Sequence, residues 1–274
     1  MSHLSFTQVS LFQLCPRRYS YRYREHLKDT VGAEAVYSRE VLHPALASLY
    51  LPGVAPDFPE LWRHYTDEVG EMAITKPLLS LSLAQSAYTR CAPLAAADLE
   101  TYDVDGIEQE RHFWLAPGGV SFIAKPDVVL RHKETGDLLS VDFKFSTRDP
   151  FLPSFHSQFV SQAIACEASA ACVITIGIAG SRARNAAENV RAEVSRTLLL
   201  ISQDQKSEWF AEAALTARIM AQCDAEQVWP KVAPGACMAF GRPCEWLDLC
   251  EQGALRVTTI ARMQQDVRAK KEAA

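Results

Sequence analysis

The chain has 274 residues, of which 48% are hydrophobic and 22% are charged. These values are ordinary for a soluble globular protein that buries a substantial core. The net charge of −5 excludes a global basic field that would draw the protein onto nucleic acid, so any such binding must come from a local patch. No apolar run approaches the roughly 20 residues that span a bilayer, and the N-terminus lacks a secretory signal. We therefore expect a cytoplasmic protein that does not bind a membrane.

Residues 4–27 begin with a predicted helix and continue into a basic and aromatic stretch. Ser5 and Gln8 form a capping-box pattern, and Pro16 predicts a break or the start of a second helix. The arginines and tyrosines that follow can bind phosphates and stack on bases. An amphipathic helix with inward tyrosines and solvated arginines explains the pattern equally well. The candidate nucleic-acid-binding residues here are Arg17, Arg18, Tyr19 and Arg22.

The segment 33–100 is predicted to be mostly helical. Its first part has an apolar side that includes Leu42 and Leu46. Pro44 directly follows His43 and predicts a helix start or a kink there. A lone histidine usually packs or forms hydrogen bonds, so His43 would be a ligand only beside a metal site.

The pattern changes to strands after residue 100. The segment 106–115 is a predicted strand with Glu108 and Glu110 on one face. Glu110 could approach a metal, although an exposed strand face is the simpler explanation. A helix over 154–170, strands near 171–180 and 194–202, and a long helix capped by Ser202 follow. This order predicts an α/β sandwich with a mixed sheet.

One hairpin in this region carries the residues that suggest chemistry. Apolar and polar residues alternate over 139–146, which is the pattern of a half-buried strand with Asp142 and Lys144 on the same face. The segment 120–132 is a second strand, and a Thr-Gly-Asp turn at 135–137 joins the two. The hairpin can bring Asp127 beside Asp142. Two carboxylates from neighbouring strands suit Mg²⁺ or Mn²⁺, and a lysine beside them can orient an attacking water.

The eight cysteines, in a chain without an export signal, favour free thiols or metal ligands over a disulfide framework. Cys237, Cys244 and Cys250 lie in a loop-like stretch, and Cys15 is the best candidate for a fourth ligand. A four-thiolate site fits either zinc or an iron–sulfur cluster. The others occupy apolar contexts and are expected to be core thiols: Cys91, Cys166, Cys172 and Cys223.

With these motifs in this order, the chain resembles the PD-(D/E)XK nuclease superfamily. More narrowly, it resembles the RecB-type nucleases, which include the AddB nuclease domain, CRISPR-associated adaptation exonucleases and phage-encoded relatives. The resemblance implies a single nuclease domain over 1–274, with a mixed central sheet flanked by helices in a catalytic core at 104–201. The segment 33–100 would be the helical portion. Segments 1–27 and 230–274 would be joined by the metal cluster.

The resemblance also implies roles for individual residues. His43, Asp127 and Asp142 would be ligands of Mg²⁺ or Mn²⁺, with the Phe143 carbonyl as a further ligand, and Lys144 would be the catalytic lysine. Gln158 matches the family's Q-x-x-x-Y helix, but Gln162 occupies the tyrosine position, so either could be the active-site glutamine. Lys125 stands where the family usually has small residues. Cys15 with the three C-terminal cysteines resembles the ligand set of the iron–sulfur branch, which implies a [4Fe–4S] cluster with zinc as the alternative.

The function implied is a metal-dependent DNA exonuclease that acts on single strands or duplex ends in recombination, repair, replication or DNA processing. Its partners would be DNA and accessory proteins such as a helicase, a recombinase or another subunit of a nuclease complex. One alternative is a catalytically silent nucleic-acid-binding or assembly module that keeps the fold and the cluster. Another is a redox or metal-sensing protein whose functional centre is the thiolates.

Overall fold

The computed structural model describes most of the chain, which forms two compact units. Unit 1 comprises Met1–Thr30, Trp114–Ser121 and Ala211–Ala274, and unit 2 comprises Val31–Phe113 and Phe122–Phe210. The described residues are 3–27, 32–70, 79–115, 119–145, 156–179, 191–232, 237 and 244–251. The end of the predicted terminal segment, 252–274, lies outside them.

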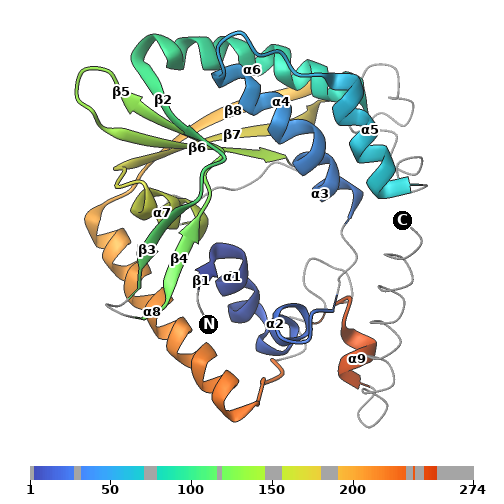
Figure 1. Ribbon diagram of the computed structural model, residues 1–274, viewed down its shortest axis with the longest axis vertical. Coiled ribbons are helices and arrows are strands. Elements are labelled where there is room, and N and C mark those ends of the chain that lie inside the picture. The colour runs from blue at the N-terminus through green and yellow to red at the C-terminus, as the bar shows by residue number, and fades with distance from the viewer. Residues whose placement is uncertain are drawn as a thin grey trace. The chain divides into compact units, whose positions relative to one another are not determined.

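Unit 2 contains a five-stranded sheet in the order β2-β5-β6-β7-β8 (Figure 1). The pair β6–β7 is parallel, and the other neighbouring pairs are antiparallel. This confirms the predicted α/β fold with a mixed sheet. The strands are β2 (Tyr102–Ile107), β5 (Val128–His132), β6 (Leu138–Phe145), β7 (Ala170–Ala179) and β8 (Arg191–Leu200).

A helical layer covers one face of this sheet. Leu42 and Leu46 belong to the same buried cluster as Val141 and Phe143 of β6, so the helices bury the apolar positions of the strand. The long helix α6 begins where Ser80 Oγ accepts a hydrogen bond from the Leu83 N–H at 3.2 Å. The helical elements are α3 (Ala33–Tyr37), η1 (Ser38–Leu42), α4 (His43–Ala47), η2 (Ser48–Tyr50), α5 (Phe58–Val69) and α6 (Leu81–Thr101).

The other face of the sheet packs against α7 (Ser157–Ala165). Because side chains alternate along a strand, Asp142 and Lys144 project toward this face while Val141 and Phe143 project toward the helical layer. Two α7 glutamines donate hydrogen bonds to Asp142, which confirms the predicted alternation over this strand.

The β5–β6 hairpin has the predicted form. Val128 pairs with Val141 and Leu130 pairs with Leu139. Gly136 in the connecting turn has a φ of 77°, a conformation that glycine adopts without steric cost. The register places Asp127, directly before β5, beside the part of β6 that contains Asp142.

The predicted strand over 106–115 is wrong in its middle. β2 ends at Ile107, and Glu108 has a φ of 51°, which takes the chain out of the strand conformation. The Glu108 N–H donates to the Asp127 carbonyl at 3.0 Å. The chain resumes as β3 (Arg111–Trp114) and then forms β4 (Ser121–Ala124).

Unit 1 contains the start of the chain and its C-terminal part. The capping box predicted from Ser5 and Gln8 is present, since the Ser5 N–H donates to Gln8 Oε1 at 2.8 Å and the Gln8 N–H donates to Ser5 Oγ at 3.4 Å. Pro16 begins a second helix as predicted. The elements are β1 (His3–Ser5), α1 (Phe6–Leu14), α2 (Pro16–Tyr23), the part of α8 (Gln203–Glu226) from Ala211 onward, and α9 (Leu247–Glu251). Among the described residues, no helix has the length and apolarity needed to cross a bilayer.

A buried group of polar side chains, Tyr50, Asp98 and Arg196, connects α6 to β8. We expect it to contribute to the stability of unit 2. Asp98 is 3% exposed, accepts a hydrogen bond from the Tyr50 hydroxyl at 2.8 Å, and pairs with Arg196 at 2.6 Å. Asp98→Ala should lower the free energy of unfolding by about 2 to 4 kcal/mol, because it leaves the arginine without its buried partner. Urea unfolding tests this. Glu193→Ala, an exposed change on β8, is the control, and an equally small effect of both would contradict the expectation.

Candidate functional site

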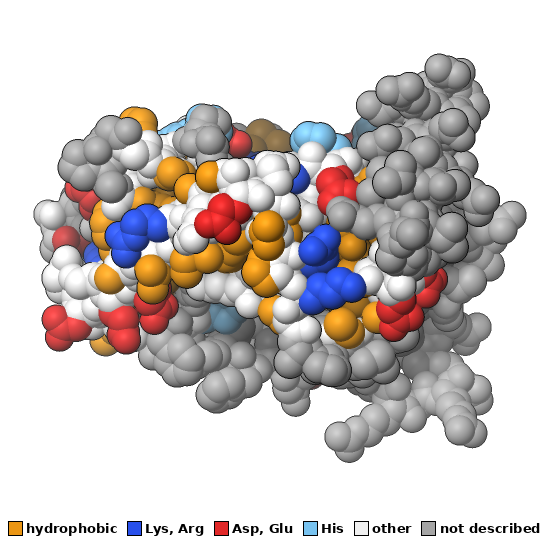
Figure 2. Space-filling model, turned by 90° about the horizontal axis from the view of Figure 1, so that it is seen from below, with side chains coloured by type: hydrophobic (Ala, Val, Ile, Leu, Met, Phe, Trp, Pro, Cys, Tyr) orange, Lys and Arg blue, Asp and Glu red, His pale blue; other side chains and the backbone are white. Residues whose placement is uncertain are grey.

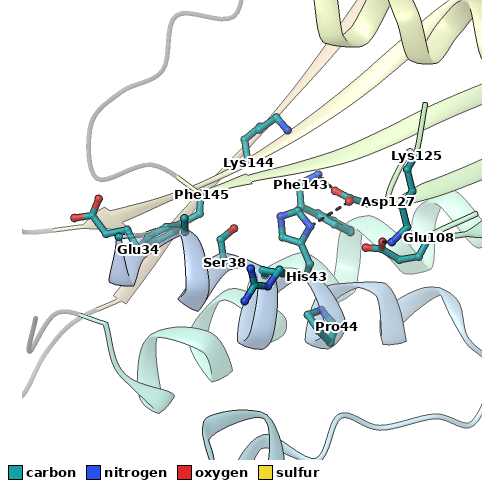
Figure 3. A pocket seen from close by; sticks show the side chains of 13 residues that line it. Glu34, Ser38, His43, Pro44, Glu108, Lys125, Asp127, Phe143, Lys144 and Phe145 are labelled. Atoms are coloured by element: carbon teal, nitrogen blue, oxygen red, sulfur yellow. Dashed lines mark hydrogen bonds and ion pairs between the residues drawn. The ribbon is translucent and has the colours of Figure 1, made fainter. Parts of the chain in front are cut away.

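Unit 2 contains a cavity of about 940 Å³ next to the β5–β6 hairpin (Figure 3). Acidic and basic residues line it, and several of the residues predicted from the sequence are among them. Its lining residues are Gly32, Glu34, Ala35, Ser38, Arg39, His43, Pro44, Glu108, Lys125, Asp127, Phe143, Lys144 and Phe145.

His43 is presented to the cavity by an irregular turn of helix. The His43 N–H donates to the carbonyl of Ser38, five residues earlier, so the turn that precedes it is a π-helical one. Pro44 cannot donate a backbone hydrogen bond and begins the next helical segment. The predicted change of helix at His43 and Pro44 is therefore confirmed, and the irregularity orients the imidazole toward the sheet.

Asp127 uses both of its oxygens. Oδ1 lies 3.1 Å from His43 Nδ1, and Oδ2 accepts a hydrogen bond from the Phe143 N–H at 2.6 Å. The side chain is 8% exposed. Burial raises its pKa, the hydrogen bond from His43 opposes this, and the charge of Asp142 raises it further, so the pKa lies above its usual range.

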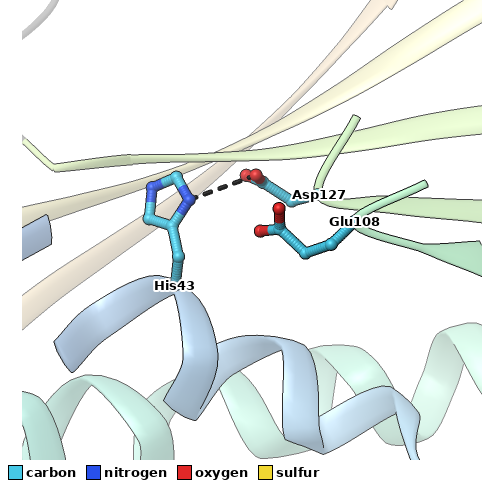
Figure 4. A group of neighbouring side chains, drawn as sticks. All are labelled: His43, Glu108 and Asp127. Carbon is cyan, nitrogen blue, oxygen red and sulfur yellow. Dashed lines mark hydrogen bonds and ion pairs between the residues drawn. The ribbon is translucent and has the colours of Figure 1, made fainter. Parts of the chain in front are cut away.

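Glu108 completes a group of three potential metal ligands (Figure 4). One ligand atom each from His43, Glu108 and Asp127 lies within 4.8 Å of the others. The sequence interpretation considered Glu110 instead, which is exposed and is 4.0 Å from His112. Glu108 was missed because its position depends on a positive φ at a non-glycine residue, which no residue pattern indicates.

Asp142 lies close by but has different partners. Its Oδ1 accepts hydrogen bonds from Gln158 Nε2 at 3.0 Å and Gln162 Nε2 at 2.8 Å. Its Oδ2 lies 2.5 Å from Lys144 Nζ. The two glutamines, one helical turn apart on α7, therefore bind the same oxygen, which orients the other oxygen toward the lysine.

The donor set fits a divalent cation. An imidazole nitrogen and carboxylate oxygens are ligands that Mg²⁺, Mn²⁺ and related ions accept. Burial lowers the pKa of His43, but its hydrogen bond to Asp127 and the charges of Asp127 and Asp142 raise it above its usual range overall. The carboxylates of Asp127 and Asp142 therefore favour a positive charge at this position, which a bound divalent cation would supply. Asp142 and the Phe143 carbonyl, also predicted as ligands, stay predictions.

The four cysteines predicted as cluster ligands all belong to unit 1. The Cys244 N–H donates to the Cys237 carbonyl at 2.7 Å, and the Tyr21 hydroxyl lies 3.4 Å from Cys250 Sγ. Cys15 lies at the junction of α1 and α2. All eight cysteines are free thiols in the structure.

The basic and aromatic stretch makes many contacts inside unit 1. Arg17 Nε donates to the Trp229 carbonyl at 2.8 Å, and Arg18 pairs with Glu245 at 2.5 Å. Tyr19 is buried, with its ring 5.4 Å from that of Trp229. The Arg22 guanidinium lies over the ring of Tyr23. The buried Tyr19 agrees with the interpretation of an amphipathic helix, but Arg17 and Arg18 bind protein partners where that interpretation expected solvated arginines. A role of this stretch in binding nucleic acid stays a prediction.

Comparison with known proteins adds the family. A family model described as the PD-(D/E)XK nuclease superfamily matches residues 3–251. A search of curated proteins finds no match. Among solved structures, a candidate exonuclease from Eubacterium rectale is 10% identical with a TM-score of 0.51, over 91% of this chain and 93% of that chain. An alkaline exonuclease from Laribacter hongkongensis is 12% identical with a TM-score of 0.34, over 71% of this chain and 96% of that chain.

The ligand group leads to a prediction about metal and stability. Mn²⁺ at about 100 times its dissociation constant stabilises a folded protein by about 2.7 kcal/mol, which should raise the thermal unfolding midpoint by about 5 to 10 °C. Asp127→Ala should lose most of this shift, whereas the exposed Asp103→Ala should keep it. Differential scanning fluorimetry with Mn²⁺ or with EDTA measures the shift. An equal shift in both variants would place the binding elsewhere.

Proposed function

We propose that this chain, which belongs to the PD-(D/E)XK nuclease superfamily, is a divalent-metal-dependent nuclease that hydrolyses phosphodiester bonds in DNA. One observation carries the proposal. The buried Asp127 and its partner His43 line one cavity together with Lys144, which pairs with the buried Asp142. A protein that only bound DNA would gain nothing from carboxylates at this position, because carboxylates repel the phosphates of the DNA.

His43, Glu108, Asp127 and Asp142 are the residues that would hold the cation. When bound, a divalent cation lowers the pKa of a coordinated water and neutralises charge that develops on the scissile phosphate. The Phe143 N–H holds Asp127 Oδ2 in place, so the orientation of this carboxylate is fixed by the strand itself. Such preorganisation lowers the cost of arranging ligands during the reaction.

Lys144 is the proposed catalytic cation. Its side chain is 30% exposed and that of Asp142 is 4% exposed, and Lys144 is among the residues that line the cavity. There it would orient the attacking water and stabilise the charge of the transition state. Gln158 and Gln162 act through Asp142 as positioning residues, because both amides donate to its Oδ1.

The proposed substrate is single-stranded DNA or the end of a duplex, which the enzyme would degrade as an exonuclease. Two considerations support this: the resemblance of the motifs to RecB-type nucleases, and the fold shared with the candidate exonuclease from Eubacterium rectale. On the face shown in Figure 2, basic and acidic side chains are interspersed among apolar ones. The basic residues that line the cavity, Arg39, Lys125 and Lys144, are the candidates for binding the DNA backbone. We propose a role in recombination, repair, replication or DNA processing beside a helicase or recombinase.

A [4Fe–4S] cluster held by Cys15, Cys237, Cys244 and Cys250 is proposed for unit 1, with zinc as the alternative. A buried donor near these thiols supports it. Trp246 is 2% exposed, packs with Cys244 and Cys250, and its Nε1–H has no hydrogen-bond partner among the described residues. A cluster sulfur would offer that N–H an acceptor, and clusters are tuned by such hydrogen bonds.

The catalytic assignment predicts the effect of two substitutions on cleavage. Lys144→Met and Asp142→Ala should each lower the rate of cleavage of end-labelled DNA by about 10²- to 10³-fold in Mn²⁺ or Mg²⁺. The matched control is Lys206→Met on α8, which should cleave normally. Circular dichroism checks that the variants fold. Normal cleavage by either variant would contradict the site, and no cleavage by folded wild-type protein would favour a nucleic-acid-binding module.

The cluster assignment predicts a change in colour and stability. Cys244→Ser should bleach anaerobically purified protein and lower its thermal stability, because a ligand of the metal is lost. Cys223→Ala, on α8, should keep the colour. Iron, sulfide and zinc analysis of the wild type tests the identity of the metal. Stoichiometric zinc in a colourless wild-type protein would contradict the iron–sulfur assignment.

A further inference from the structure

Glu108 has one positive partner and also belongs to the candidate metal site. Its Oε2 lies 2.5 Å from Lys125 Nζ, and its carboxylate also belongs to the group whose ligand atoms lie within 4.8 Å of one another. Both Glu108 and Lys125 line the cavity and point toward one another in Figure 3. The carboxylate is therefore placed between an internal cation and the position where a divalent cation would bind.

The backbones of the two residues are fixed, while their side chains are not. The Glu108 N–H donates to the Asp127 carbonyl at 3.0 Å, and Glu108 has a positive φ. A non-glycine residue keeps that conformation only where its surroundings impose it. Lys125 is separated from Asp127 only by Pro126, whose ring restricts φ. The side chains of Lys125 and Glu108 are 48% and 37% exposed, so they can exchange partners at little cost.

We propose that Lys125 is the counter-cation of Glu108 in the metal-free protein and a phosphate-binding residue in the metal-loaded protein. This inference rests on the proposed nuclease function. A divalent cation attracts the Glu108 carboxylate more strongly than one exposed ammonium does. Once Glu108 turns to the metal, the Lys125 ammonium loses its partner and pairs with a phosphate of the DNA strand in the cavity.

The exchange couples metal binding to substrate binding. Metal releases Lys125 for the phosphate, and a phosphate that holds Lys125 leaves Glu108 available to the metal. By linkage, each ligand must then raise the affinity for the other by the same factor. The protein would thus bind DNA tightly only when its active site is loaded with metal.

The first test is a double-mutant cycle on metal affinity, measured by isothermal titration calorimetry with Mn²⁺ on the full chain. Glu108→Gln should weaken Mn²⁺ binding about tenfold, because it removes a charged ligand. Lys125→Met should tighten Mn²⁺ binding about two- to fivefold, the range expected for an exposed ion pair. In the Glu108→Gln background, Lys125→Met should have little effect. Simple repulsion between Lys125 and the metal would instead give the same gain in both backgrounds.

The second test measures binding of a labelled single-stranded oligonucleotide by fluorescence anisotropy, in the Lys144→Met background so that cleavage does not interfere. Mn²⁺ should increase the affinity for DNA, and Lys125→Met should reduce this increase by about two- to fivefold. Lys206→Met is the matched control for loss of one positive charge and should leave the increase unchanged. The readout is binding, so it does not depend on activity.

The outcomes separate the inference from the function on which it rests. If the wild type binds Mn²⁺ but Glu108→Gln binds it equally well, the inference is wrong while the proposed metal site stands. The inference is also wrong if Lys125→Met and Lys206→Met respond alike to Mn²⁺ in the DNA measurement. If the wild type does not bind Mn²⁺, the metal site itself fails and the exchange fails with it.

Discussion

The structure of the site depends on one buried carboxylate. Asp127 is held by the Phe143 N–H on one oxygen and approached by His43 on the other. A strand backbone and a helix side chain thereby fix the same anion from two directions. Burying that anion beside Asp142 raises its pKa, and this unfavourable electrostatic arrangement is what a divalent cation would stabilise. The same carboxylates would give the site an affinity for a divalent metal ion.

The fold makes this arrangement by using both faces of β6. Val141 and Phe143 anchor the strand in the apolar cluster under the helical layer, so its position is fixed by hydrophobic burial. Asp142 and Lys144 face α7, where Gln158 and Gln162 orient the carboxylate. Hydrophobic packing on one face of β6 thus holds the strand in place, and this fixes the positions of the polar side chains on the other face. Catalytic side chains on rigid strands can be held more accurately than those on loops.

Much of this arrangement follows from local sequence patterns. The alternation in β6 and the turn with Gly136 predicted the hairpin that brings Asp127 beside Asp142. The sequence could not choose between Gln158 and Gln162, because residues four apart lie on one helix face. In the structure both side-chain amides donate to Asp142. His43 was identified only through the resemblance to a family, since its approach to Asp127 depends on contacts 84 residues apart in sequence.

Other features of the site could not be predicted from the sequence, because they depend on tertiary contacts. Glu108 enters the site through a left-handed backbone conformation and a bond to the Asp127 carbonyl, and neither has a signature in the residue pattern. Likewise, Arg17 and Arg18 contact Trp229 and Glu245, which are more than 200 residues away in sequence. The pattern of basic and aromatic residues could not distinguish these contacts from a surface for nucleic acid.

The most direct test of the metal centre is an anomalous difference map from crystals of the full chain soaked in MnCl₂, recorded at the manganese edge. The account predicts a peak about 2.0 to 2.3 Å from His43 and Asp127 ligand atoms, with Glu108 or Asp142 at the same distance. A strong peak at other residues, with this group unliganded at saturating Mn²⁺, would contradict the assignment of the metal site to these residues.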